Sequence, residues 1–245
     1  MQGVNKMPGL GTIINVAAII AGGFIGLLFG KFMKPRFQDT LMKSCGVCVM
    51  FVGIAGVLTK MLTVKDGKIT ADGTLMMIAC LALGSVIGEI INFERLFEKF
   101  GEWLKIKTGN SKEKSFVNAF VTASFTVCIG AMAIVGAIED GINRDSSTLI
   151  IKAILDMLII CIMTASLGKG CIFSAIPVGL LQGSVTALSG LIRPLLTEPA
   201  LNNLSLLGSV LIFCVGVNLV FDKKFKVANM LPSVVVAAVW GLIIK

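Results

Sequence analysis

GLGTIINVAAIIAGGFIGLLFG, at residues 9–30, contains no charged side chain and is apolar over most of its length. An α-helix needs about 20 apolar residues to cross a hydrocarbon layer of ~30 Å. The stretch has that length, and it exceeds the ~7–15 residues of the apolar region in a cleavable signal peptide. It therefore predicts a retained transmembrane helix.

Seven further apolar runs follow this helix. They lie at 40–59, 73–93, 116–138, 147–168, 171–192, 203–221 and 227–244. The run at 171–192 contains Pro177, Gln182 and Ser184, so we expect either a span or a broken or re-entrant segment there. The predicted fold class is all-α: a polytopic transmembrane bundle of about eight helices, seven to eight, in a single integral membrane domain over 1–245.

The composition of the whole chain agrees with this class. Apolar residues make up 56% of the sequence, charged residues 15%, and the mean hydropathy is +0.92. Soluble domains carry about a quarter charged residues. The net charge of +8 is spread between the apolar runs without interleaved stacking aromatics, so we expect the lipid bilayer and no nucleic acid as a partner.

The connections between runs differ in their content of Lys and Arg. Those after the first, third, fifth and seventh runs together account for 14 Lys and Arg residues, against 8 on the other side. The positive-inside rule makes them cytoplasmic, which places both termini outside. Segment 94–107 lies in one of them and carries apolar residues at helical spacing among charged ones: Leu96, Phe97, Phe100, Trp103 and Leu104. The pattern predicts an amphipathic interfacial helix, with a soluble linker helix as the alternative.

Glycines recur at intervals of four residues, as in Gly22, Gly26 and Gly30. This spacing leaves bare backbone on one helix face and allows another helix to approach closely. The strings GGFIGLLFG at 22–30 and GSVIGEIIN at 84–92 are also alike. The likeness is compatible with weak internal repeats, and equally with chance similarity between two glycine-rich helices.

Asp156 is the sharpest functional signal because it lies near the middle of the fifth run. A charge at the bilayer centre costs at least ~2.5–3.5 kcal/mol, so it faces the interior of a bundle. Lys152 precedes it by four residues on the same helix face. The pair could hold a coupling ion or a charged solute, or it could be a buried structural ion pair.

Further polar residues interrupt the apolar runs. Glu89 lies toward the cytoplasmic end of the third run, where an interfacial carboxylate is the alternative to a functional one. Glu139 and Asp140 close the fourth run, where acids oppose the helix dipole and could form a cation-attracting mouth. Neutral polar residues that could join helices or ligate a solute are Asn15, Gln182, Asn218 and Asn229.

Irregular backbone is favoured in GKGCIFSAIP at 168–177, which contains Gly168, Gly170 and Pro177. Broken helices expose carbonyl and N–H groups, and transporter sites are often built from them. We therefore expect a binding-site break in this segment.

The sequence lacks the residues and motifs that several kinds of catalysis and metal binding require. The chain has no histidine, which excludes Ser-His-Asp and Cys-His catalysis, and it has no HExxH or phosphate-loop motif. An odd number of cysteines, seven, argues for packing residues and against a disulfide framework. We expect no enzyme activity, no catalytic residue, no metal site and no cofactor.

Several strings together resemble one protein family. They are RFQDTLMKSCG at 36–46, LGSVIGEIINFE at 83–94, CIGAMAIVGAIEDG at 128–141 and FSAIPVGLLQG at 173–183. In this order they resemble the bacterial YqgA/YdfK-like family, over nearly the whole chain. The resemblance implies a multi-pass protein of the bacterial inner membrane, of unknown function, and supplies no substrate or site residues.

The leading functional hypothesis is a transporter or channel for a small polar or ionic solute. Its site would be lined by Asn15, Glu89, Glu139, Asp140, Lys152, Asp156, Gln182 and Asn218. The alternative is a non-enzymatic membrane scaffold or a regulatory subunit of a membrane complex. A homo-oligomer is compatible with both hypotheses.

Overall fold

The fold is that of a computed structural model in which residues 7–65, 67–195, 197–221 and 225–243 are described. It is helical nearly throughout, so the predicted all-α class is confirmed. The helices are α1 Leu10–Phe32, α2 Pro35–Met61, α3 Thr74–Ile91, α4 Phe93–Lys107, α5 Phe116–Cys128, α6 Ala131–Ile142, α7 Ser147–Leu167, α8 Ala175–Ala187, α9 Ser189–Ile192, α10 Glu198–Phe221, α11 Val227–Met230 and α12 Pro232–Ile243. Two 3₁₀ turns, η1 Lys169–Ser174 and η2 Arg193–Leu195, and two strands, β1 Leu62–Lys65 and β2 Lys68–Ala71, complete the described chain.

Six of these segments are long and apolar enough to cross a membrane. They are α1, α2, α3, α7, the continuous segment of η1 and α8, and α10. The pair α5 and α6 adds a seventh span if it crosses as one unit. The eighth predicted run folds as the shorter apolar helices α11 and α12, and its last residue, Ile244, lies outside the described residues.

The fourth predicted run differs from the expected single helix. It is bent by 61° between α5 and α6, and α6 continues to Ile142, beyond the predicted end at 138. Gly130 lies at the break with φ 152°, a backbone conformation that L side chains rarely adopt. The sixth run also starts irregularly, because Gly168 has φ 98° and is followed by the 3₁₀ turn η1, where the sequence predicts a break.

The chain divides into two compact units. The first comprises Met1–Leu41, Gly101–Cys128 and Met132–Pro194, and the second comprises Met42–Phe100, Ile129–Ala131 and Leu195–Lys245. The prediction of a single integral membrane domain stays a prediction, because this division concerns packing within the chain.

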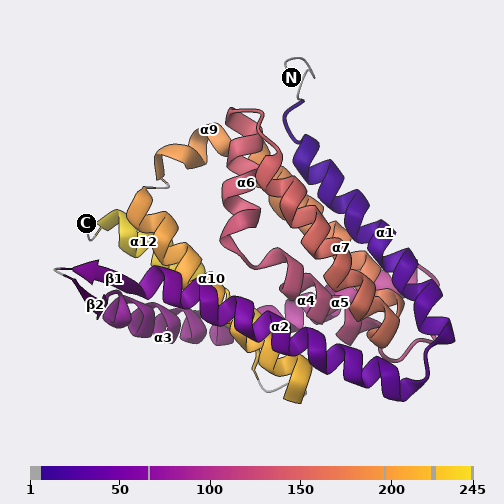
Figure 1. The fold of residues 1–245 in the computed structure, drawn as a ribbon. Helices are drawn as coiled ribbons and strands as arrows, with labels where there is room; N and C mark the ends of the chain where they lie inside the picture. Colours follow the sequence, from indigo (N-terminus) through magenta and orange to yellow (C-terminus); the bar gives the residue numbers. More distant parts are fainter. Residues whose placement is uncertain (1–6, 66, 196, 222–224, 244–245) are drawn as a thin grey trace. The chain divides into compact units, whose positions relative to one another are not determined.

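The first unit is organised around α1 and α7, which lie side by side (Figure 1). The two helices run parallel, since Gly11 contacts Leu149 near their starts and Gly30 contacts Ala165 near their ends. A Cβ atom at Gly22 or Gly26 would overlap a backbone carbonyl oxygen of α7. The predicted glycine face therefore does bring two helix backbones together.

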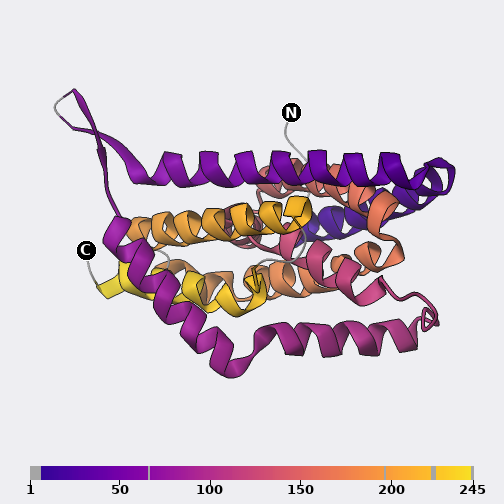
Figure 2. The same ribbon diagram turned by 90° about the horizontal axis from the view of Figure 1, so that it is seen from below.

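The second unit repeats this kind of packing with other partners. Gly84 and Gly88 of α3 lie directly against the backbone of Ser233 and Asn229, in α12 and α11. The order of these contacts makes α3 antiparallel to its partners. A hairpin of β1 and β2, in register from Leu62 opposite Ala71, connects α2 to α3 (Figure 2).

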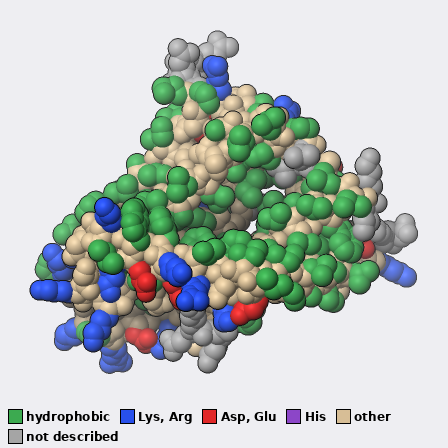
Figure 3. Space-filling model, turned by 180° about the vertical axis from the view of Figure 1, so that it is seen from behind, with side chains coloured by type: hydrophobic (Ala, Val, Ile, Leu, Met, Phe, Trp, Pro, Cys, Tyr) green, Lys and Arg blue, Asp and Glu red, His purple; other side chains and the backbone are tan. Residues whose placement is uncertain are grey.

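Apolar side chains are exposed over much of the molecular surface, as Figure 3 shows for one face. Phe24 and Phe29 of α1 and Ile90 of α3 are among them. Such a surface requires an apolar solvent, which a bilayer supplies. The predicted helix at 94–107 is present as α4, with Leu104 buried and Trp103 half exposed, while its interfacial position stays a prediction.

The glycine contacts generate a matched test. Replacing Gly26 with Ala would push a methyl group against the Cys161 carbonyl and to within 2.9 Å of Thr164 Cβ, so we expect an unfolding temperature lower by several degrees. The same change at Gly183, in α8, meets nothing within 4 Å and should be neutral or slightly stabilising, because Ala favours a helix over Gly by ~1 kcal/mol. Thermal unfolding of both variants in detergent compares them, and equal effects would contradict the close α1–α7 contact.

Candidate functional site

The interior of the first unit holds an ion pair on α7. Lys152 and Asp156 are four residues apart, which places them on one helix face as the sequence predicts. The Lys152 Nζ atom lies 2.8 Å from Asp156 Oδ1 and 2.7 Å from Oδ2. The two side chains are only 9% and 5% exposed, so the pair is buried. Each charge therefore depends on the other for compensation.

The break after α5 supplies a third partner. Lys152 Nζ donates a hydrogen bond of 2.8 Å to the backbone carbonyl of Val127. Val127 is the penultimate residue of α5, in the last turn, where carbonyl groups lack an intrahelical partner. An ammonium group has three donors, and all three are used by the two carboxylate oxygens and this carbonyl.

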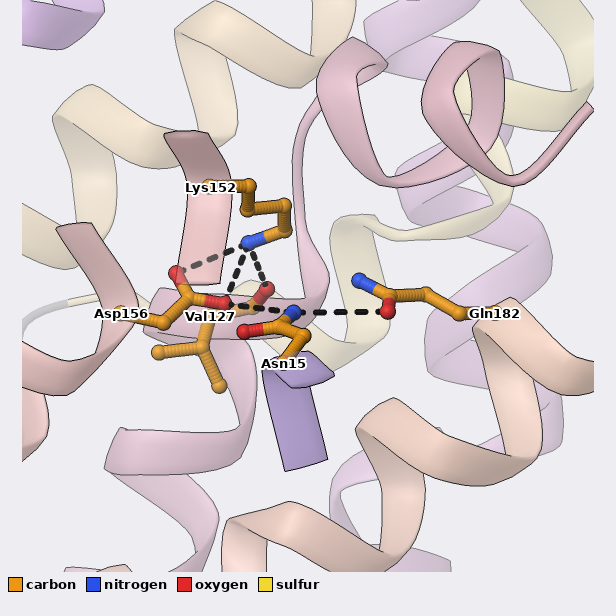
Figure 4. A network of polar contacts seen from close by, with 5 residues as sticks. All are labelled: Asn15, Val127, Lys152, Asp156 and Gln182. Carbon is orange, nitrogen blue, oxygen red and sulfur yellow. Dashed lines mark hydrogen bonds and ion pairs between the residues drawn. The ribbon is translucent and has the colours of Figure 1, made fainter. Parts of the chain in front are cut away.

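Two amides from other helices extend the network (Figure 4). The side-chain nitrogen of Asn15, in α1, donates to Asp156 Oδ2 at 3.0 Å and to Gln182 Oε1 at 3.3 Å. Gln182 belongs to α8, and both amide side chains are fully buried. Four predicted site residues from three helices thus meet at one point: Asn15, Lys152, Asp156 and Gln182.

The network is incomplete on its amide side. Asn15 Oδ1 and Gln182 Nε2 have no hydrogen-bond partner among the described residues. Buried amide groups without partners are costly, so they indicate a place for water or for a polar ligand. One vacant acceptor and one vacant donor therefore lie beside the compensated ion pair.

Two further predicted residues of this unit, near the end of α6, bond the starts of other helices. Asp140 is fully buried, and its Oδ2 accepts a hydrogen bond of 3.0 Å from the backbone N–H of Gly11 in the first turn of α1. Glu139 Oε2 accepts one of 2.7 Å from the hydroxyl of Thr148, in the first turn of α7. Both acids oppose the dipole of their own helix α6, but each lies at the favourable N-terminal end of another helix.

The remaining two predicted residues belong to the second unit. Glu89 forms an exposed ion pair of 2.7 Å with Lys226 and accepts a hydrogen bond from Asn229. Asn218 bonds the backbone N–H and carbonyl of Phe225, which ties the end of α10 to the start of α11. Their partners in the second unit account for these residues structurally, and a role as ligands stays a prediction.

Sequence reasoning missed two contributors. The Val127 carbonyl is invisible in a side-chain pattern, although Gly130 in CIGAM signals the break that frees it. Thr12, about one helical turn before Asn15, is buried, and its hydroxyl has no partner among the described residues. Asn229, which the sequence does single out as a possible link between helices, accepts a hydrogen bond of 2.8 Å from the Glu94 N–H in the first turn of α4.

A metal cluster is not among the features of this site. No group of three or more His, Cys, Asp or Glu side chains comes together among the residues that the structure describes. The cysteines are free thiols, and none takes part in the network.

A charged network inside apolar helices of spanning length defines the class: a multi-pass α-helical membrane protein. Over residues 10–242 the chain matches the family described as a protein of unknown function, DUF554, and it belongs to that family. The resemblance predicted from sequence is thereby confirmed.

Two relatives come from different bacterial species. One is "Uncharacterized membrane protein YdfK" of Bacillus subtilis (strain 168), 28% identical over 94% of each chain. The other is "Uncharacterized protein YqgA" of Escherichia coli (strain K12), 28% identical over 93% of this chain and 94% of the relative. No solved structure matches the chain.

The energetic coupling of the ion pair can be measured. Lys152→Met leaves the Asp156 carboxylate buried without its cation, and Asp156→Asn leaves the ammonium without its anion. We expect each change to cost ~3–5 kcal/mol of unfolding free energy, and the double variant to recover most of that loss. Denaturant unfolding in mixed micelles of the three variants gives the double-mutant cycle.

A matched control lies in the second unit. Lys226→Met and Glu89→Gln disrupt an ion pair whose side chains are 61% and 56% exposed, and such pairs contribute only ~0–1 kcal/mol. A double variant at 152 and 156 that loses the sum of both single effects would show that the two residues do not act as a pair.

Proposed function

We propose that this protein is a transporter or channel for a small polar or ionic solute, and that the solute binds at the Lys152–Asp156–Asn15–Gln182 network. The observation that carries the proposal is the ion pair buried in an apolar helix bundle and completed by the carbonyl of a broken helix. The proposal includes a non-enzymatic role, in the bacterial inner membrane.

Energetics favour a functional over a structural origin for the pair. Burying two charges costs several kcal/mol, and well-packed apolar residues of similar volume are often neutral or stabilising in their place. Within a membrane the preference for apolar residues is stronger, because no water is available to the charges. A bundle that needed only stability would gain nothing from Lys152 and Asp156.

The arrangement also suits reversible binding. Lys152 fills an oxygen cage made by the Asp156 carboxylate and the Val127 carbonyl, as a bound cation would. The vacant Asn15 Oδ1 and Gln182 Nε2 atoms beside it offer a solute two polar contacts. The bend between α5 and α6 gives this region backbone that can rearrange, and discontinuous helices are typical of transporter sites.

A solute site must be reachable from water, which gives a test that needs no knowledge of the solute. In a background with the native cysteines replaced, single cysteines at Asn15 and Gln182 should react with a membrane-impermeant thiol reagent in vesicles. Cysteines at Ile13 and Leu180, on the same two helices, should not react, because those side chains are exposed on the apolar surface, at 61% and 65%.

Either outcome decides the proposal. Reaction at 15 and 182 but not at 13 and 180 supports an aqueous pathway to the network, and reaction from both sides of the membrane supports alternating access or an open pore. Failure of 15 and 182 to react in correctly folded protein would overturn the proposal and leave the scaffold or regulatory-subunit hypothesis.

A further inference from the structure

Asp140 is a buried carboxylate with one vacant oxygen. Its Oδ2 is held by the Gly11 N–H, but among the described residues Oδ1 has no partner and no cationic side chain pairs with the group. The start of α1 offsets part of its charge, typically by 0.3–1 kcal/mol and up to ~2 kcal/mol. That compensation acts through Oδ2 and leaves Oδ1 unexplained, and an uncompensated buried carboxylate costs far more.

Thr12, the residue after Gly11, carries a second buried oxygen at the start of α1. Its hydroxyl has no hydrogen-bond partner in the described part of the chain, and the residue is 7% exposed. Gly23, about three turns further along α1 and so nearly in line with Thr12, faces Ile172 of η1, and Val16 faces Gly179 of α8. Gly30, five turns after Thr12 and in line with it, faces Ala165 of α7. The Thr12 side chain therefore points to the boundary between the side of α1 that α7 covers and the side that η1 and α8 cover.

Helix α6, which carries Asp140, contacts α8. The hydroxyl of Thr186, in α8, donates a hydrogen bond of 3.1 Å to the Ala137 carbonyl of α6. Ala137 lies about one helical turn before Asp140, so α6 contacts α8 close to the carboxylate that bonds the start of α1.

Asn15 links this region to the Lys152–Asp156 network described above. Asn15 follows Gly11 by one turn of α1, about 6 Å along the helix axis. Its vacant Oδ1 belongs to the amide that bonds Asp156. Three buried oxygens without partners among the described residues therefore belong to residues at or near the start of α1: Oδ1 of Asp140, which bonds Gly11, and Thr12 Oγ1 and Asn15 Oδ1 of α1 itself.

From this we infer that Asp140 and Thr12 bind a monovalent metal cation, which then passes the Asn15 oxygen on its way to the Lys152–Asp156 pair. Oxygen ligands select a hard cation. A single carboxylate with neutral oxygens balances one positive charge, whereas Mg²⁺ and Ca²⁺ sites collect several carboxylates or waters. The inference rests on the proposed function and names the class of its solute.

The test is the stability of the purified protein in detergent. LiCl, NaCl and KCl are each titrated against choline chloride at constant ionic strength. A cation that binds only the folded state raises the unfolding temperature along a saturating curve. We expect at least one of the three salts to raise it by several degrees more than choline chloride does.

Three variants locate the site. Asp140→Asn should abolish the cation-dependent shift. Glu139→Gln removes the same charge from the neighbouring residue, whose carboxylate bonds Thr148, and should retain the shift. Thr12→Val keeps every charge and should move the midpoint at least several-fold to higher cation concentration, which keeps the test valid if Asp140→Asn does not fold.

The outcomes separate this inference from the proposed function. Equal unfolding temperatures in all four salts, or a shift that persists in Asp140→Asn, would overturn the cation site and leave water as the partner of these oxygens. If the cysteines at 15 and 182 still react with the thiol reagent in that case, the proposed solute pathway remains supported. Only the assignment of the solute as a monovalent cation would then be wrong.

Discussion

A complete set of partners for one buried ammonium group is the constraint on which the first unit depends. Lys152 sits among apolar helices, so each of its three donors must find an oxygen within the protein. Two come from the neighbouring turn of its own helix, and the third exists only because α5 stops and leaves the Val127 carbonyl available. The broken helix and the buried charge are therefore one arrangement. Straightening α5 into α6 would pair that carbonyl within the helix and leave the ammonium short of an acceptor.

The glycine face of α1 positions Asn15, which bonds the anionic partner of Lys152. Backbone contact at Gly22 and Gly26 fixes both the separation of α1 and α7 and their relative height. Asn15 is carried on the same helix, so its amide reaches Asp156 at hydrogen-bond distance. A residue with a side chain at either glycine would displace α1 and with it the Asn15 amide. Close packing and polar recognition are coupled through one helix.

Local patterns in the sequence predict what depends on local geometry. The spacing of Lys152 and Asp156 and the glycine intervals of α1 are helix-periodic, and the structure uses both as expected. Local patterns do not predict which of the eight predicted site residues come together. Glu89 and Asn218 find partners in the second unit, and Asp140 serves the start of α1, because long-range packing decides which polar groups meet. The alike strings at 22–30 and 84–92 share glycine packing, yet α1 has a parallel partner and α3 an antiparallel one. Both strings serve close helix packing, and internal repeats stay a prediction.

The parallel pairing of α1 and α7 restricts how many times the chain can cross the membrane between them. Consecutive spans alternate in direction, so two spans that run the same way are separated by an odd number of crossings. Between α1 and α7 lie two spans of full length, α2 and α3, together with the charged amphipathic α4 and the bent pair of α5 and α6. Two crossings alone would make α7 antiparallel to α1, contrary to the matched order of their contacts. If α1, α2, α3 and α7 all cross the bilayer, counting requires one more crossing between α3 and α7. Of the two segments that lie there, the apolar bent pair suits a crossing better than the charged α4 does.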